Sequence, residues 1–340
     1  MTGKFAYVLG GFMILTSVVI TQSCTEEGDS NDDLLGNWKR TSDFDGNARS
    51  EAVTFVIGNY AYITTGTTDR ERFNDLWEFN LTRNYWSQKA DLPGEARNSA
   101  VGFAINGKGY VGTGYNGSNK LKDFWEYDPS TNNWTQKADF AGSARYDATG
   151  FAIGNNGYVS CGFDGNYLKD LYEYNPVTDT WTQKASIGGS KRSAAQVFVL
   201  NDKAYICSGN NNGSSLNDLW MYDAATDTWS EKRKISNVSD DAYDDNYIGI
   251  QRFNGVFFVI NNRAYITTGV NGAITSLTWE YNPDTDLWTQ KTGFEGSGRE
   301  GAVAIVLNDR GFILTGRSGS LSYDNMYEFQ PAAEHDSNDN

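Results

Sequence analysis

Short apolar segments alternate with polar, glycine-rich turns along most of this chain, and the alternation repeats about every 48 residues. In one unit, an apolar stretch at residues 100–105 and a tight Asn-Gly turn precede a second apolar stretch that ends at Gly114. A variable loop follows, and then the segments DFWEYD and NNWTQKA, which are joined by a polar turn. Short alternating segments predict β-strands, and Asn-Gly suits a two-residue hairpin. Each unit is therefore expected to contain four strands, named a to d in chain order.

Residues of four kinds recur at fixed spacing in these units. A glycine at the end of strand b follows an arginine by 17 residues in all six copies. A strand-c aromatic follows this glycine by ten or eleven residues, and in five units a tryptophan comes nine residues later. The arginines are Arg49, Arg97, Arg145, Arg192, Arg252 and Arg299, the glycines are Gly66, Gly114, Gly162, Gly209, Gly269 and Gly316, and the tryptophans are Trp38, Trp86, Trp134, Trp181, Trp229 and Trp288. Such repetition predicts units that pack against like neighbours.

Four strands in a unit of this length predict one blade of a β-propeller. The arginine, the strand-ending glycine and the two aromatics resemble the kelch repeat, although pairs such as Thr65-Gly66 replace the usual Gly-Gly. The resemblance covers residues 38–329 and implies an all-β, six-bladed propeller. The sixth unit lacks its last tryptophan, whereas Trp38 stands before the first unit. We therefore expect the N-terminal strand around Trp38 to complete the last blade and close the ring, which removes unpaired sheet edges.

The first 23 residues have the features of an export signal. Lys4 precedes an apolar run at residues 5–20, and the small Ser23 precedes Cys24. This resembles a bacterial lipoprotein signal and implies lipidation of Cys24, with an ordinary secretory signal as the alternative. Residues 24–35 are expected to form an acidic tether, 36–331 the propeller, and 332–340 a disordered acidic tail. The acidic run after Cys24 resembles the export signal of Bacteroidetes surface lipoproteins, which implies an outer-membrane, surface-exposed protein; a periplasmic location is the alternative.

The composition of the chain limits the ligands and the kinds of catalytic site that we expect. The formal charge of −15, from 28 basic and 43 acidic residues, weighs against nucleic acid, whose affinity for proteins depends on Lys and Arg. The single histidine, His335, lies in the expected tail, so neither a Ser-His-Asp nor a Cys-His site is expected. Galactose oxidase, an enzyme with kelch repeats, needs histidine copper ligands, and its chemistry is not expected either. Cys161 and Cys207 stand at different offsets from their glycines and are expected to be small buried residues without a disulfide.

Residues that all units share are expected to serve packing and loop anchoring, which is the role we assign to the repeated arginines and tryptophans. Function is expected in residues that differ between units. With strand a innermost, the d–a and b–c loops share the face around the pore. The candidate ligand-binding residues on this face are Glu51, Asn98, Tyr115, Tyr146, Asp147, Asp164, Asn254 and Glu300. The b–c loops add Asp69, Arg70, Asn116, Asn210, Asn211, Asn212, Asn271 and Arg317.

Acids, amides and aromatics together favour a sugar or a peptide as ligand. We therefore expect a non-catalytic surface propeller that binds a glycan or a protein partner, without a cofactor. One alternative is a sugar epimerase that resembles the secreted sialic-acid mutarotases, in which Glu51, Asp147 and Glu300 supply acid and base. Another is a periplasmic scaffold for protein assembly.

One d–a loop, between Trp229 and Arg252, is longer than the others and rich in aspartate. Asp240, Asp241, Asp244 and Asp245 suggest Ca²⁺, because oxygen ligands suit this ion. Their spacing departs from that of ordered Ca²⁺ loops, which favours a solvated partner-binding loop instead.

Overall fold

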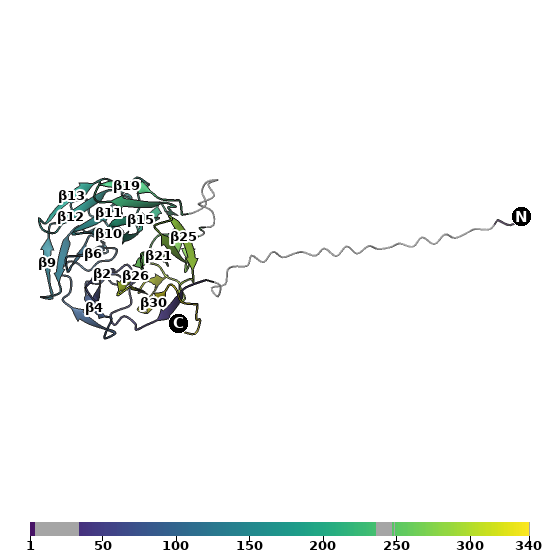
Figure 1. Cartoon of the computed structure of the whole chain (residues 1–340), viewed down its shortest axis with the longest axis horizontal. Coiled ribbons are helices and arrows are strands. Elements are labelled where there is room, and N and C mark those ends of the chain that lie inside the picture. The colour runs from purple at the N-terminus through teal and green to yellow at the C-terminus, as the bar shows by residue number, and fades with distance from the viewer. Residues whose placement is uncertain (4–33, 236–246, 248, 340) are drawn as a thin grey trace.

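The computed structural model describes residues 1–3, 34–235, 247 and 249–339. Its thirty strands form six four-stranded antiparallel sheets arranged in a ring, with three two-stranded hairpins in the loops (Figure 1). The innermost strands β2, β6, β10, β14, β20 and β26 contact one another in this order, and β26 contacts β2. The fold is therefore a six-bladed β-propeller, as the repeat predicts. No helix in the described ranges is long and apolar enough to cross a membrane.

The first three blades are continuous in the chain. Blade 1 contains β2 (Val53–Ile57), β3 (Tyr60–Thr64), β4 (Leu76–Asn80) and β5 (Tyr85–Lys89). Blade 2 contains β6 (Val101–Ile105), β7 (Lys108–Gly112), β8 (Phe124–Asp128) and β9 (Asn133–Lys137). Blade 3 contains β10 (Thr149–Ile153), β11 (Asn156–Ser160), β12 (Leu171–Asn175) and β13 (Thr180–Lys184). The strands of each blade pair in chain order, from the axis to the rim.

The other three blades carry a short hairpin in each b–c loop. Blade 4 contains β14 (Gln196–Leu200), β15 (Lys203–Cys207), β18 (Leu219–Asp223) and β19 (Thr228–Glu231), with hairpin β16 (Asn210–Asn211) and β17 (Ser214–Ser215). Blade 5 contains β20 (Val256–Ile260), β21 (Arg263–Thr267), β24 (Thr278–Asn282) and β25 (Leu287–Lys291), with hairpin β22 (Val270–Asn271) and β23 (Ala273–Ile274). Blade 6 contains β26 (Val303–Leu307), β27 (Arg310–Leu314), β30 (Met326–Gln330) and β1 (Asn37–Arg40), with hairpin β28 (Arg317–Ser318) and β29 (Leu321–Ser322).

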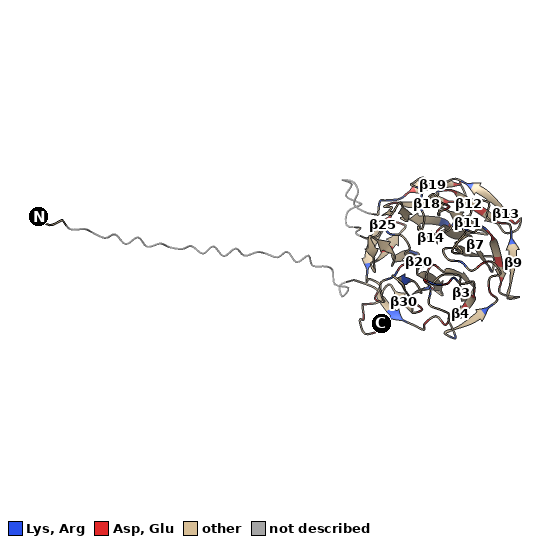
Figure 2. Cartoon of the chain, turned by 180° about the vertical axis from the view of Figure 1, so that it is seen from behind, with Lys and Arg blue, Asp and Glu red and all other residues tan. Residues whose placement is uncertain are grey.

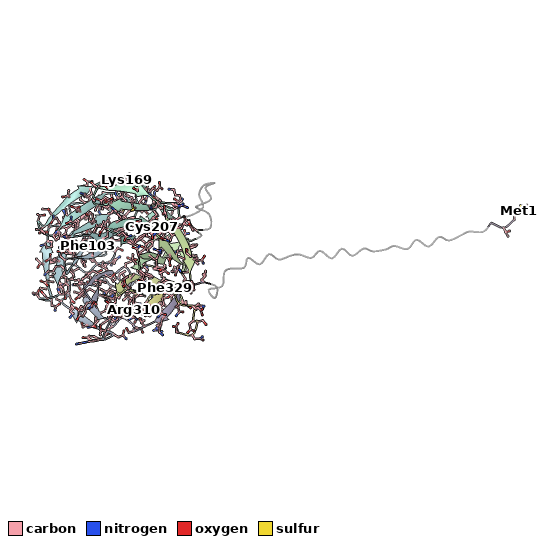
Figure 3. The ribbon with its side chains drawn as sticks, in the orientation of Figure 1. Met1, Phe103, Lys169, Cys207, Arg310 and Phe329 are labelled. Carbon is pink, nitrogen blue, oxygen red and sulfur yellow. The ribbon has the colours of Figure 1, made fainter. Side chains whose placement is uncertain are left out.

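Aromatic side chains pack between neighbouring blades. Figure 3 shows the side chains on the ribbon, with Phe103 and Phe329 labelled. Tyr62 of blade 1 stacks on Phe55 and also contacts Tyr127 of blade 2, with ring centroids 5.6 Å apart. Four of the strand-d indoles also donate to a backbone carbonyl of the preceding blade, as Trp134 does with its Nε1–H to Ala90 at 2.8 Å. Large rings therefore join one blade to the next through buried area and directed hydrogen bonds.

The two free cysteines in the described part of the chain are Cys161 and Cys207, and both are buried. Burial raises the pKa of each thiol, so both are neutral, small core residues at neutral pH. The expectation of buried cysteines without a disulfide between them is confirmed.

The N-terminal strand closes the ring. β1 pairs antiparallel with β30, and Trp38 stands opposite Phe329. The Trp38 side chain is fully buried and packs against Phe258, Phe294 and Phe329. Its indole N–H donates to the carbonyl of Thr292 at 3.2 Å. The expectation that this strand completes the last blade is therefore confirmed.

The C-terminal segment differs from the expected disordered tail, because it lies against the closing strand as far as Asp339. The backbone N–H of Asp336 donates to Asn37 Oδ1 at 2.9 Å, and Asn37 Nδ2 donates to Asp339 at 3.1 Å. His335 pairs with Glu295, whose carboxylate also accepts the backbone N–H of Trp38 at 3.0 Å. Both side chains of the His335–Glu295 pair are largely buried. The segment thus adds polar contacts over the point where the ring closes.

Each blade contains one fully buried arginine that joins three parts of the chain. In blade 2, Arg97 donates to the carbonyls of Glu95 and Thr113, at 2.8 and 3.1 Å, and forms a two-pronged ion pair with Asp123. The pattern recurs with Asp75, Asp170 and Asp218 in blades 1, 3 and 4. Bidentate pairing fixes the guanidinium in one plane. The arginine therefore holds the d–a loop, the end of strand b and the start of strand c together.

The same arginines also join neighbouring blades through their backbone. The N–H of each strand-ending glycine donates to the carbonyl of the arginine in the next blade, at 2.8 to 3.0 Å, in all six positions including Gly316 to Arg49 across the closure. These glycines have φ between 90° and 101°, a region that L side chains rarely adopt. An added Cβ at Gly66 would lie 2.9 Å from the carbonyl oxygen of Ser50. The glycine and the arginine are thus two halves of one junction between blades.

The rim carries charges of both signs. Strand-d lysines pair with strand-c glutamates across the sheet, as in Lys89 with Glu78 at 2.9 Å and Lys291 with Glu280 at 3.2 Å. In Figure 2 the outer strands carry charges of either sign, a basic position on β9 and an acidic position on β19. Charged outer strands oppose edge-to-edge association of propellers.

The closing strand gives a test of the ring. We expect Trp38→Ala to destabilise the protein by about 3–5 kcal/mol, the range for removing a buried aromatic side chain. Lys39→Ala, on the same strand but half exposed, should cost much less. Urea denaturation followed by tryptophan fluorescence measures both variants. Equal midpoints for the two would show that β1 is dispensable for closure.

Candidate functional site

We call the face formed by the d–a and b–c loops the upper face, and its centre is a ring of backbone hydrogen bonds. The residues two positions after the arginines have φ between 50° and 61°. Each N–H donates to the carbonyl of the equivalent residue in the preceding blade, at 2.7 to 3.2 Å, and the sixth bond closes the circle. These ring residues are Glu51, Ser99, Asp147, Ala194, Asn254 and Gly301. Left-handed backbone is costly for most of these residue types, so the fold imposes it.

The ring surrounds the mouth of the central channel, where a cavity of about 170 Å³ is lined by the ring residues and the residues that follow them. Three carboxylates lie at this mouth, those of Glu51, Asp147 and Glu300. Arg317 from β28 makes ion pairs with Glu51 at 3.1 Å and with Glu300 at 3.5 Å. The three acids predicted from the sequence are therefore brought together, and a guanidinium that joins two of them lies beside them.

A polar network extends from this mouth over the neighbouring blades. Asn98 Nδ2 and Ser99 Oγ both donate to Glu51 Oε2, the latter at 2.9 Å. Arg72 Nε donates to Asn98 Oδ1 at 2.6 Å. On the other side, Asn254 Nδ2 donates to Glu300 Oε2 at 3.0 Å. The predicted residues Asn98 and Asn254 thus orient the carboxylates, and their amides are already used by the protein.

Asp147 has an unusual electrostatic setting. Loss of solvation raises its pKa to about 7, and the charges of Glu51 and Glu300 contribute in the same direction. Hydrogen bonding with Ser99 and the charge of Arg317 oppose the increase. Asp147 therefore changes its protonation state near neutral pH, whereas an ordinary aspartate is ionised there.

Aromatic side chains form an arc beside the mouth, over blades 2 and 3. Tyr115 contacts Tyr146 at a centroid distance of 5.4 Å, Tyr146 contacts Phe163 at 5.6 Å, and Phe163 contacts Tyr167 at 5.1 Å. The guanidinium of Arg72 lies 5.1 Å above the Tyr115 ring. Burial and the charge of Asp147 raise the pKa of Tyr146, which stays a neutral phenol. The predicted residues Tyr115 and Tyr146 therefore belong to one continuous aromatic surface.

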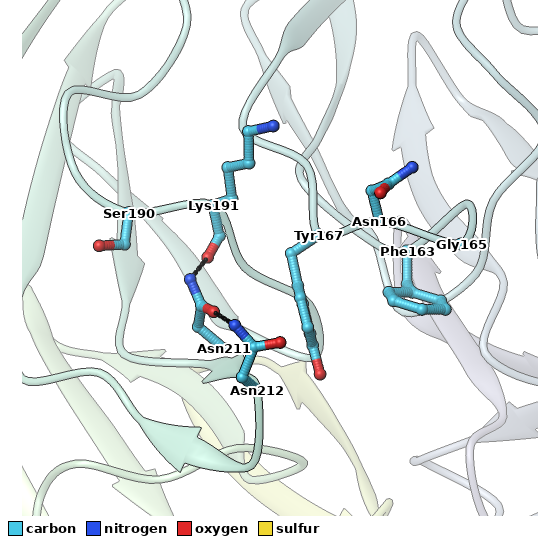
Figure 4. A pocket seen from close by; sticks show the side chains of 8 residues that line it. All are labelled: Phe163, Gly165, Asn166, Tyr167, Ser190, Lys191, Asn211 and Asn212. Carbon is cyan, nitrogen blue, oxygen red and sulfur yellow. Dashed lines mark hydrogen bonds between the residues drawn. The ribbon is translucent and has the colours of Figure 1, made fainter.

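This arc ends in a groove of about 560 Å³ between blades 3 and 4, which we call the inter-blade groove (Figure 4). It is lined by Phe163, Gly165, Asn166, Tyr167, Ser190, Lys191, Asn211 and Asn212. Asn211 Nδ2 donates to the carbonyl of Lys191 and Asn212 Nδ2 donates to Asn211 Oδ1, both at 2.7 Å. These bonds fix two amides on one wall, opposite the loop that carries the aromatic rings.

Asp164 serves its own loop. Its Oδ1 accepts the backbone N–H of Asn166 at 3.0 Å, which stabilises the tight b–c turn of blade 3. It lines neither the mouth cavity nor the inter-blade groove among the residues described.

No metal site is visible in the described ranges, where no group of three His, Cys, Asp or Glu side chains is placed to hold an ion. The proposed lipidation site Cys24 and the aspartates Asp240, Asp241, Asp244 and Asp245 lie outside the described residues.

Comparison with known proteins agrees with this architecture. The model of the kelch motif matches residues 98–140, 144–187 and 191–234, which are three successive units. The chain is a six-bladed kelch-repeat propeller. The solved structure of the protein YjhT is similar to this kelch propeller, with a TM-score of 0.69 and 16% sequence identity over 84% of this chain and 95% of that chain. This likeness extends to the fold alone. No curated protein matches the sequence.

The kelch propeller has functional candidates that sequence reasoning missed. Phe163 and Tyr167 were not selected, although Phe163 follows its strand-ending glycine directly, as Tyr115 does in blade 2. Ser99, which donates to Glu51, stands at the same repeat position as Asp147 and Asn254. Alignment of the units would have found these residues. The groove itself depends on how two blades face each other, which no single unit contains.

The charge at the mouth predicts a pH-dependent stability. The folded state keeps the Asp147 proton up to about pH 7, whereas the unfolded chain releases it near pH 4. Stability therefore falls as the pH rises between these values. We expect Asp147→Asn to be more stable than the parent at pH 8, on the order of 4 kcal/mol for a shift of three pKa units, with the gain much reduced at pH 5. Urea denaturation at both pH values measures this.

The matched control is Asp284→Asn, at an exposed turn on the opposite face. It should show no comparable gain at pH 8. A pH-independent difference between Asp147→Asn and the parent would contradict a raised pKa at the mouth.

Proposed function

We propose that this kelch propeller is a non-catalytic carbohydrate-binding protein whose site is the inter-blade groove. The observation that carries the proposal is the composition of this groove, in which two aromatic rings meet three amides and one lysine within about 560 Å³. Its volume is in the range of small-ligand sites. The proposed setting is the outer surface of a bacterial cell, with the chain anchored through Cys24.

The side chains that line the inter-blade groove suit the two kinds of surface that a sugar presents. A pyranose ring has an apolar face that packs on aromatic side chains, and Phe163 and Tyr167 supply such surfaces. Its hydroxyls donate and accept hydrogen bonds, as asparagine amides do. Asn166 and Asn212 are exposed at the groove, and among the described residues Asn212 donates its side-chain N–H to Asn211 alone. Amide capacity therefore remains for a ligand, while Asn211 is fixed by its own contacts.

A glycan array probed with the purified chain tests the proposal. We expect binding that Tyr167→Ala weakens at least tenfold, because the substitution removes the wall on which a sugar ring stacks. Asn212→Ala should weaken binding less, by the loss of one amide contact. Tyr60→Ala removes an exposed tyrosine at the a–b turn of the opposite face, and should leave binding unchanged.

Two outcomes would count against a glycan ligand at this groove. Binding that survives Tyr167→Ala would place the site elsewhere on the propeller. Failure to bind any glycan would favour the protein-partner or scaffold alternatives.

A specific observation also favours the second candidate function, an epimerase that exchanges the anomers of a sugar. Asp147 has a pKa of about 7 at the channel mouth, Glu51 lies on the same ring, and the charge of Glu300 also acts on Asp147. A general acid–base group works best when its pKa is close to the working pH. In a sugar seated over the mouth, Asp147 would take the proton of the anomeric hydroxyl and return a proton to the ring oxygen, while the bond from C1 to the ring oxygen breaks and the C1 carbonyl forms. Reversal of these steps on either face of the carbonyl gives either anomer.

Exchange spectroscopy by NMR on free reducing sugars separates the two candidates. Epimerase activity predicts faster exchange between anomers with the parent chain and loss of this acceleration in Asp147→Asn. Tyr60→Ala again serves as the control with an intact mouth. Exchange at the uncatalysed rate would exclude the epimerase for the sugars tested and leave the binding proposal intact.

A further inference from the structure

The aromatic arc beside the channel mouth is not part of the packed core. Its four rings are partly exposed, and none belongs to the buried clusters of the described residues: Tyr115, Tyr146, Phe163 and Tyr167. In blades 1 and 4, on either side of the arc, serine stands at the position of Tyr146. Blades therefore form without an aromatic ring at this position, which leaves the arc as a surface for a ligand.

Basic side chains without a carboxylate partner lie in the loops along this arc. In the upper-face loops of blades 1 to 4, those that make no ion pair with a described residue are Arg70, Arg72, Lys120, Lys169 and Lys191. The basic residues at the a–b turns of the opposite face are all paired, as Arg310 is with Glu328 at 2.6 Å. Although the chain has a formal charge of −15, this part of its surface offers unpaired positive charge to an anionic ligand.

Arg72, at one end of the arc, is held in place with part of its guanidinium unused. Its Nε donates to Asn98 Oδ1 at 2.6 Å, and its guanidinium carbon lies 5.1 Å from the centre of the Tyr115 ring. The side chain is half-buried, and its two Nη atoms make no hydrogen bond with a described residue. Two parallel N–H groups on one planar edge match the two oxygens of a carboxylate. Because the guanidinium is already oriented, less entropy is lost when such a ligand binds.

Lys191 lies at the other end of the arc, in the inter-blade groove together with Tyr167 (Figure 4). It is the only basic residue among those that line the groove. Asn211 uses its backbone carbonyl, whereas the exposed Nζ makes no hydrogen bond or ion pair with a described residue. A carboxylate on a sugar that stacks in the groove can therefore contact this ammonium group.

We propose that the ligand of the inter-blade groove is an acidic oligosaccharide, one whose linked sugars carry carboxylates. One sugar would stack on Tyr167 with its carboxylate at Lys191, the next sugars would lie along the arc, and a further carboxylate would pair with Arg72. The proposal rests on the proposed carbohydrate-binding function and deepens it. It names the class of glycan, and it extends the site from the groove to the far end of the arc.

The acids of the upper face leave the arc open to such a ligand. Glu51 and Glu300 share the charge of Arg317. The pKa of Asp147 is about 7, so this side chain carries only part of a negative charge near neutral pH. Asp164 is bound within its own turn and does not line the groove. The remaining negative charge at the mouth keeps carboxylates out of the channel, and they are left to the cations along the arc.

Isothermal titration of the purified chain, at pH 7 and 0.15 M NaCl, tests the proposal with a panel of uronic acids. The probes are tetramers of galacturonic acid, of mannuronic acid and of hyaluronan, their uronic acid monomers, and the methyl esters of the tetramers. We expect at least one tetramer to bind at least tenfold more tightly than its monomer, because only the tetramer spans the arc. Its methyl ester, which has no charge on the same sugars, should bind at least tenfold more weakly than the acid.

Three substitutions locate the ligand on the arc. Arg72→Gln should weaken binding of the acidic tetramer about tenfold and leave binding of its methyl ester unchanged, which a purely structural role of Arg72 would not produce. Tyr115→Ala should weaken binding of the tetramer several-fold without affecting the monomer. Lys191→Gln should weaken binding of both. Arg83→Ala removes an exposed arginine without an ion pair to a described residue, at a c–d turn of the opposite face, and should bind like the parent.

Four results would overturn the proposal. Binding of neutral glycans on the array, without binding of any tetramer in the panel, would exclude an acidic ligand and leave the carbohydrate-binding function intact. Binding of a sulfated carrageenan tetramer as tight as that of the uronic acids would show that charge alone is recognised. Equal affinity for monomer and tetramer would confine the site to the groove. Failure to bind any glycan would remove the proposed function as well.

Discussion

The buried arginine at the start of each blade is the interaction on which the rest of the structure depends. Its side chain joins three segments of its own blade, and its carbonyl accepts the glycine N–H of the preceding blade. A fully buried guanidinium is stable only when its donors are satisfied. The six junctions therefore form together, and they set the backbone of the two residues that follow each arginine. The ring at the channel mouth is a direct consequence of this arrangement.

Much of the fold could be predicted from the sequence because the determinants are periodic and local. The spacing of arginine, glycine and tryptophan defines the blade, and the orphan Trp38 predicts how the ring closes. Even so, the aspartate before strand c recurs in four units, and it was not recognised as the partner of the arginine. Pairing over 25 or 26 residues leaves no local pattern. It becomes visible only when the charged positions of all units are compared.

The candidate site was less predictable, since it depends on contacts between blades. Sequence reasoning selected Glu51, Asp147 and Glu300, which meet at the mouth because they follow three of the arginines. It missed the inter-blade groove, because Tyr167 and Asn212 belong to different units and meet only after the blades pack. It also missed the order of the C-terminal segment, where an acidic composition hides the buried pair of His335 and Glu295.

Blades 5 and 6 keep the fold of the other blades although they lack the aspartate that pairs with the arginine. Leu277 and Asn325 replace the aspartate, so Arg252 and Arg299 pair with no carboxylate among the described residues. Burial then lowers the pKa of each guanidinium to about 10, which still leaves both charged at neutral pH. Arg252 is held by carbonyls, and Arg299 is also covered by the rings of Phe294 and Tyr323. A junction that tolerates such exchange fixes the backbone of the loop residues beside it but not the identity of their side chains. The side chains of these loops are therefore free to differ between blades, as they do in the inter-blade groove.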